Sequence, residues 1–177
     1  DVRPAGEALP DVPLTREVSI IVSQEPTTLP FEPNQFDAVL SCGVLEHVDE
    51  FSQPGNEKKS LAEIQRILKT GGRLLIYQLP QQYAWQEALI RQFKLGYSHP
   101  RRYTGHEISQ MLQAQGFKIE SIRHANLIPK NLTGMPEQAR KIYSRFSQEL
   151  IAMDGSLCKI PFLNAFAGVL ELTAISV

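Results

Sequence analysis

The chain has 177 residues, of which 42% are hydrophobic and 21% charged, so we expect one globular domain rather than a disordered chain. A formal net charge of -1 excludes a strong overall attraction to nucleic acid or to an anionic membrane. The apolar runs are shorter than the roughly 20 residues of a transmembrane helix, and the two cysteines are far apart in the sequence. We therefore expect free thiols and a cytoplasmic protein.

The first half of the chain predicts a strand-helix-strand unit. Residues 17–23 and 36–44 are short, apolar, β-branched runs, which are typical of buried strands in a parallel sheet. An amphipathic helix is expected over residues 57–69, with the pair Gly71-Gly72 ending it. A strand over residues 72–80 would then complete a βαβ unit.

The second half predicts further helices and strands. Residues 82–95 have helical periodicity and are expected to cover the sheet, and residues 104–117 begin with a capping box and end at a glycine. A strand over 118–125 and a helix over 134–153 follow, and residues 164–177 alternate like a last strand, antiparallel at or near the sheet edge. The side chains expected to face inward are Trp85, Leu89 and Phe93 in the first helix and Ile142, Phe146 and Leu150 in the last.

Three motifs stand in a fixed order: "TLPFEPNQFDAVLSCGVLEHVDE", "SLAEIQRILKTGGRLLIYQLP" and "RRYTGHEISQMLQAQGF". Together they resemble class I S-adenosylmethionine-dependent methyltransferases, in the branch that contains small-molecule and lipid methyltransferases. The resemblance covers most of residues 17–125. It implies a Rossmann-like α/β fold with a mostly parallel sheet and a final antiparallel strand. It further implies one domain over residues 1–177, incomplete at the N-terminus, with residues 126–162 as a helical insertion or lid.

The same resemblance implies S-adenosyl-L-methionine as the cofactor. Glu25 matches an acidic residue that accepts a hydrogen bond from the adenine amino group. Pro26 takes the position whose backbone N–H usually meets the adenine ring, although proline has no N–H. Asp1 matches the acidic residue that binds the ribose hydroxyls. The residues expected to meet the methionine portion are Ser41, Cys42 and Gly43.

One family motif is absent from the sequence. Members of the family surround the cofactor with a glycine-rich turn after their first strand, and no G-x-G-x-G stretch occurs in this chain. We expect upstream residues to supply it. The alternative hypothesis is a non-catalytic methyltransferase-like domain that binds a partner or scaffolds an assembly, and a second alternative is a nucleic-acid methyltransferase.

Ligands of open α/β sheets bind beyond the carboxyl ends of the strands, so we expect the acceptor at that edge. Candidate residues for the acceptor side are His47, Tyr83, Tyr97, His99 and Arg102. For His47 we weigh proton transfer against a structural or binding role and favour the latter, because the sulfonium methyl group is already activated. No histidine has a second ligand at metal-binding spacing, so no metal site is expected. The acceptor is expected to be a small molecule or lipid-like, and apolar loops near residues 126–162 suggest either peripheral membrane contact or ordinary packing.

Overall fold

The computed structural model describes residues 21, 27–49, 54–94, 96–129 and 136–177. Its elements along the chain are β1 (Phe36–Cys42), η1 (Leu45–His47), α1 (Asn56–Ile67), β2 (Leu68–Pro80), α2 (Trp85–Phe93), α3 (Gly105–Ala114), β3 (Phe117–Ala125), α4 (Glu137–Arg145), α5 (Ser147–Leu157), η2 (Asn164–Phe166) and β4 (Val169–Ser176). The strand predicted over residues 17–23 falls outside the described residues, apart from Ile21.

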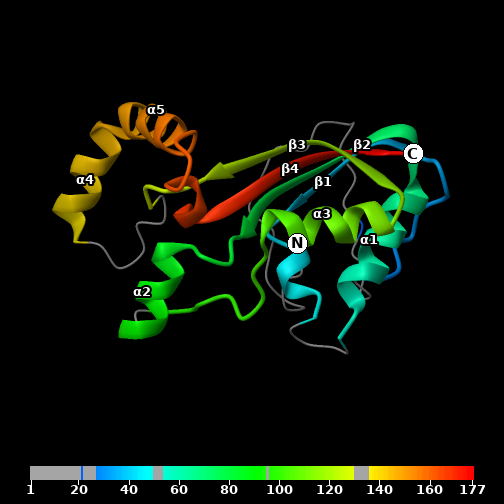
Figure 1. The fold of residues 1–177 in the computed structure, drawn as a ribbon, viewed down its shortest axis with the longest axis horizontal. Coiled ribbons are helices and arrows are strands. Elements are labelled where there is room, and N and C mark those ends of the chain that lie inside the picture. Colours follow the sequence, from blue (N-terminus) through cyan, green and yellow to red (C-terminus); the bar gives the residue numbers. More distant parts are fainter. Residues whose placement is uncertain (1–20, 22–26, 50–53, 95, 130–135) are drawn as a thin grey trace.

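The described strands form one mixed sheet in the order β1-β2-β4-β3 (Figure 1). β1 pairs in parallel with β2, while β4 is antiparallel to both β2 and β3. β1, β2 and β3 therefore have their carboxyl ends at the same end of the sheet. The predicted Rossmann-like α/β fold class is confirmed, and so is a final antiparallel strand, which lies next to the outer strand β3.

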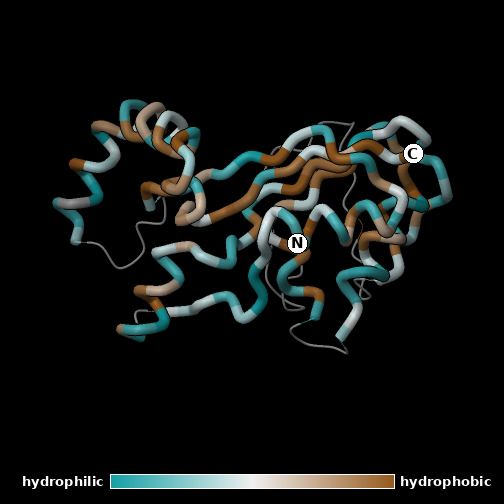
Figure 2. Tube along the Cα trace, viewed as in Figure 1, coloured by the Kyte–Doolittle hydropathy of each residue, from teal (hydrophilic) through white to brown (hydrophobic). Residues whose placement is uncertain are grey.

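The core lies between one face of the sheet and the helices α1 and α3, which flank that face in Figure 1. Figure 2 shows that the apolar residues concentrate along the strands. In α3 the Thr104 half of the predicted capping box is present, because the Thr104 side chain accepts a hydrogen bond from the N–H of Glu107 at 3.1 Å, while the Glu107 side chain pairs with Arg101. Buried apolar residues from these elements include Leu61, Ile64, Leu74, Ile76, Ile108, Leu112 and Leu172.

Two predictions about the first half of the chain were wrong. β1 was expected to be a buried strand, but none of its residues is buried and Leu40 is 63% exposed. Apolar character identified the strand, whereas burial depends on which elements cover its faces. The glycine pair does not end the helix: α1 stops at Ile67, Leu68 is already extended, and Gly71-Gly72 lie inside β2. A Cβ on Gly72 would lie 2.8 Å from the carbonyl oxygen of Lys69, so this close approach requires a glycine.

The apolar faces predicted for two helices do not meet the sheet. In α2, Leu89 and Phe93 are exposed, and the buried side chain is Glu87. The long helix predicted over 134–153 breaks at Phe146 into α4 and α5, with Ile142 and Phe146 exposed. All three helices lie beyond the carboxyl ends of the strands in Figure 1. Periodicity tells which side chains share a face, but not whether that face reaches the core.

Candidate functional site

The candidate site begins where β1 ends. Ser41 and Cys42 close the strand, and Gly43 follows with a φ of 62°, in the left-handed region that favours glycine. The N–H of Gly43 donates to the carbonyl oxygen of Tyr77 at 3.1 Å, which ties this turn to β2. A Cβ on Gly43 would only make ordinary contact with Glu46 Oε1, at 3.8 Å. Backbone conformation, rather than lack of space, therefore requires glycine here.

Directly after this turn, η1 presents Glu46 and His47. The Glu46 side chain is buried, and its Oε1 lies 3.8 Å from His47 Nε2. His99, from the loop after α2, brings its ring centroid to 5.5 Å from that of His47. The Tyr97 ring contacts both imidazoles, with centroid distances of 6.4 Å to His47 and 5.2 Å to His99. Two segments far apart in the sequence thus converge at the end of β1.

Glu87 on α2 fixes the loop that carries His99. Its carboxylate accepts hydrogen bonds from His99 Nδ1 at 2.9 Å, from the His99 backbone N–H at 3.2 Å and from Ser98 Oγ at 2.7 Å. A carboxylate only accepts, so Nδ1 carries the proton. Burial alone would raise the pKa of Glu87, but the hydrogen bonds from His99 and Ser98 outweigh it and hold that pKa below its usual range. Glu87 is therefore charged at neutral pH.

The adjacent arginines Arg101 and Arg102 have different surroundings. Arg101 pairs with the buried Glu57 through two nitrogens and with Glu107 at 2.8 Å. Its guanidinium also lies over the Tyr103 ring, 4.4 Å from the centroid. Arg102 has a buried Nε and Nη1 with no hydrogen-bond partner among the described residues. Burial, then the neighbouring Arg91, lowers the pKa of Arg102. Arg101 forms structural ion pairs, whereas the guanidinium of Arg102 has N–H donors that a ligand can use.

A loop over residues 126–128 joins the helices at this end of the sheet. The indole N–H of Trp85 and the side-chain amide of Gln86 donate to carbonyl oxygens of this loop at 2.8 and 2.6 Å. From α5, the buried carboxylate of Asp154 accepts two backbone N–H groups of the same loop at 3.1 and 2.8 Å. These bonds hold α2 and α5 beside the carboxyl ends of the strands.

The structure brings together some of the residues selected from the sequence. His47, Tyr97 and His99 form one cluster, and Arg102 is close enough to Glu87 for that carboxylate to affect its pKa. Tyr83 is 62% exposed at the entrance to α2. The residues proposed to bind adenosine, Asp1, Glu25 and Pro26, lie outside the described residues.

Sequence reasoning missed the role of Glu87. No spacing rule links it to His99, because the contact runs from a helix to the loop that follows. Cys42 and Cys158 are not joined in a disulfide, as expected.

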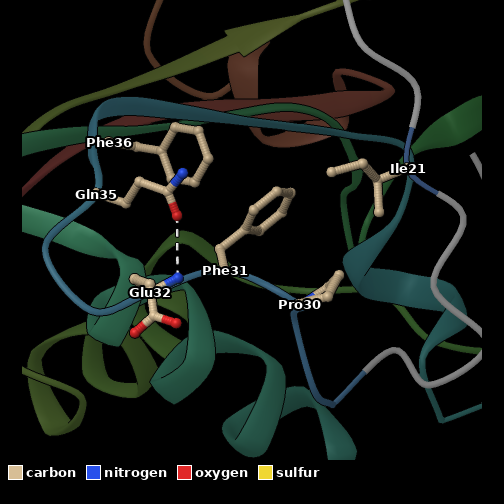
Figure 3. A pocket seen from close by; sticks show the side chains of 6 residues that line it. All are labelled: Ile21, Pro30, Phe31, Glu32, Gln35 and Phe36. Atoms are coloured by element: carbon tan, nitrogen blue, oxygen red, sulfur yellow. Dashed lines mark hydrogen bonds between the residues drawn. The ribbon is translucent and has the colours of Figure 1, made fainter.

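A separate cavity of about 610 Å³ lies at the other end of β1 (Figure 3). It is lined in part by Phe36, the first residue of that strand, and by Phe31, whose ring meets that of Phe36 edge-on at 4.9 Å. Gln35 Oε1 accepts the backbone N–H of Glu32 at 2.9 Å beside it. Ligands of open α/β sheets bind at the carboxyl ends, so this cavity is distinct from the candidate site.

Comparison with known proteins finds similar sequences and similar folds. A family model described as a methyltransferase domain matches residues 5–76. The uncharacterized protein MJ0638 of Methanocaldococcus jannaschii is 37% identical over 91 residues, which is 51% of this chain and 34% of that protein. A SAM-dependent methyltransferase from Methanosarcina mazei superposes with a TM-score of 0.51 at 15% identity, covering 86% of this chain and 64% of the other.

A candidate methyltransferase solved in complex with the Haloferax volcanii Trm112 methyltransferase activator gives the same TM-score of 0.51 at 15% identity, covering 86% of this chain and 58% of the other. These likenesses show that the chain has the Rossmann-like α/β fold of those proteins. The chain spans about a third of the length of MJ0638 and less than two thirds of each solved chain.

Proposed function

We propose that the chain is an S-adenosyl-L-methionine-dependent methyltransferase that acts on a small-molecule or lipid-like acceptor. The observation that carries this proposal is the methyltransferase-domain match over residues 5–76, which includes β1, the turn at Gly43, and η1. These are the segments that build the candidate site at the carboxyl end of the sheet. Fold alone does not establish function, so the site has to be tested for its fit to the cofactor.

The strand end at Ser41 to Gly43 fits the methionine portion of the cofactor. Cys42 and Gly43 are exposed, so a ligand can approach their backbone. The N–H of Gly43 is already bonded to Tyr77, so we propose that carbonyl oxygens of this turn meet the cofactor. The α-ammonium group of the cofactor is a donor and suits such oxygens. We assign adenine to Glu25 and Pro26 and ribose to Asp1 as part of the same proposal.

On the acceptor side, Arg102 favours an anionic group. Buried donors without partners carry a desolvation penalty, and a carboxylate or phosphate would relieve it with charge-assisted hydrogen bonds. Arg102 lies close to Glu87, which in turn holds His99 beside Tyr97 and His47. An acceptor bound there would lie next to the end of β1, where the cofactor is proposed to bind.

Exposed apolar side chains at the same end of the sheet favour an acceptor with an apolar portion, or contact of this surface with a membrane. They come from α4, α5 and the segment around η2: Ile142, Phe146, Ile151, Met153, Ile160, Phe162, Leu163 and Phe166. Large exposed apolar patches commonly mark interaction sites. Among the described helices, none has both the length and the apolar character that a bilayer crossing requires.

The proposed chemistry needs alignment more than proton transfer. S-adenosyl-L-methionine supplies an activated methyl group on a sulfonium, which an acceptor atom attacks in line. The protein's part is to hold the acceptor against that methyl group and to exclude water, which accounts for much of the rate in such reactions. We therefore assign His47 a binding or positioning role.

Calorimetric titration of the full-length protein with S-adenosylhomocysteine tests the proposal. We expect saturable binding with one ligand per chain. Absence of binding at millimolar ligand would contradict methyl transfer and favour a non-catalytic, methyltransferase-like scaffold domain. A salt-dependent association with RNA or DNA in the same preparation would instead favour nucleic acid as the acceptor.

A further inference from the structure

Glu46, His47 and His99 form a cluster with metal-binding geometry. Each of them offers one ligand atom, and these atoms all lie within 4.8 Å of one another. Ligands bound at about 2.0–2.2 Å to a common ion are typically about 3–4 Å apart. The Glu46 Oε1 to His47 Nε2 distance of 3.8 Å is already in that range. The ligand atom of His99 lies within 4.8 Å of the other two.

The donor set indicates the kind of ion. Two imidazole nitrogens and one carboxylate oxygen suit divalent first-row transition metals such as Zn²⁺, Co²⁺ or Mn²⁺. Mg²⁺ and Ca²⁺ prefer oxygen ligands throughout, so they fit this set less well. Three protein ligands leave at least one coordination position open, as in catalytic rather than structural zinc sites. The Glu46 side chain is buried, while His47 and His99 remain partly exposed, which leaves access for a water or a substrate oxygen.

The surroundings of His99 are those of a metal ligand. Ligating histidines generally donate their second ring N–H to a carboxylate or carbonyl, which fixes the tautomer and the ring orientation. Here His99 Nδ1 donates to Glu87 Oε1 at 2.9 Å, so Nε2 is the ring nitrogen without a proton. Glu87 also holds the backbone N–H of His99. The ring of His99 is therefore positioned before any ion binds.

We propose that Glu46, His47 and His99 bind one divalent transition-metal ion at the carboxyl end of β1, with Glu87 as the group that orients His99. Histidine spacing along the sequence does not reveal this site, because its ligands come from η1 and from the loop after α2. The proposal does not depend on methyl transfer.

The test is metal binding to the full-length protein after removal of metals by a chelator. Calorimetric titration with Zn²⁺ is expected to show one ion bound per chain, and Co²⁺ to give visible absorption bands of a nitrogen and oxygen environment. His47→Gln and His99→Gln are each expected to weaken Zn²⁺ binding at least tenfold. His106→Gln, which changes an exposed histidine on α3, is the matched control and should bind Zn²⁺ like the unmodified protein. Circular dichroism verifies that each variant is folded.

Two results would overturn the proposal. One is Zn²⁺ binding that His47→Gln and His99→Gln leave unchanged, or no binding at millimolar Zn²⁺. The other is a thiolate-to-cobalt charge-transfer band, which would assign the ion to a cysteine. All these measurements are made without cofactor or acceptor, so a failure of the metal site is distinguishable from a failure to bind S-adenosylhomocysteine.

Discussion

The carboxylate of Glu87 accepts a hydrogen bond from the imidazole of His99 at 2.9 Å, so a helix that lies off the sheet sets the orientation of a ring at the end of β1. Glu87→Gln keeps the size of the side chain but leaves a single acceptor oxygen for three donors. Loss of such supporting contacts typically weakens metal affinity about 10–100-fold. We expect Zn²⁺ affinity, measured by calorimetry, to fall by about tenfold or more. Glu149→Gln, at an exposed position of α5, is the control; equal affinities of the two variants would refute the assigned role.

Replacing each of the neighbouring arginines by methionine is expected to change the stability of the fold differently. Arg101→Met would leave the buried carboxylate of Glu57 without its ion pair and should lower the free energy of unfolding by about 2 kcal/mol or more. Arg102→Met removes donors that have no partner among the described residues, so stability should be unchanged or slightly higher. Urea denaturation at neutral pH measures the stability of both variants. A similar loss of stability in the two variants would contradict the distinction.

The turn after β1 can be tested with an alanine substitution of its glycine and a control substitution of a second glycine elsewhere. Gly43→Ala places a Cβ on a residue with a φ of 62°, which should destabilise the fold by about 1–2 kcal/mol. Gly155→Ala, in α5, meets no atom within 4 Å and should stabilise the helix by about 0.5–1 kcal/mol. Thermal denaturation of both variants is the measurement. If Gly43→Ala were as stable as the unmodified protein, the left-handed conformation at this turn would be in doubt.

Lowering the pH should selectively remove the contribution of Glu63, on α1, to the free energy of unfolding. Its side-chain hydrogen bond with Arg66, together with the N–H of Leu29, lowers the pKa of Glu63 from 4.5 to about 2. A carboxylate whose pKa is lower in the folded state stabilises the fold fully above pH 4.5, and this contribution is lost as the pH falls toward 2. Glu63→Gln should therefore be less stable at pH 7, by no more than about 1 kcal/mol because solvent screens the pair.

The difference between Glu63→Gln and the unmodified protein should narrow between pH 5 and pH 3 in denaturant titrations. Glu137→Gln, at an exposed position of α4, is the control for the effect of the substitution itself. A difference that stays constant with pH would argue against a lowered pKa for Glu63.

The sheet was the part of the fold that the sequence predicted well. The strands of the described sheet correspond to apolar or alternating runs, and the helices α1 and α3 carry apolar stripes, such as Ile108 with Leu112, that do reach the core. The helices beyond the sheet were predicted less well. Periodicity placed Leu89 and Phe93 on one face of α2, but nothing local specifies whether a sheet lies opposite that face.

The candidate site was predicted in its parts but not in its arrangement. His47, Tyr97 and His99 were each selected as candidates for the acceptor side. Their association depends on how the loop after α2 folds back over η1, and the bonds that hold this loop come from Glu87. Such contacts join residues with no fixed separation in the sequence, so no motif encodes them.

The attachment of α2 has a consequence for hydrogen exchange. This helix is held beside the sheet by polar contacts of Trp85 and Gln86 with the loop over residues 126–128, while its apolar side chains Leu89 and Phe93 face solvent. Segments that bury little apolar surface open at low free energy without unfolding the rest of the protein. The amides of α2 should therefore exchange with solvent well before those of β2. Each such opening would separate Glu87 from His99 and disrupt the cluster of His47, Tyr97 and His99 at the end of β1, while the sheet stays intact.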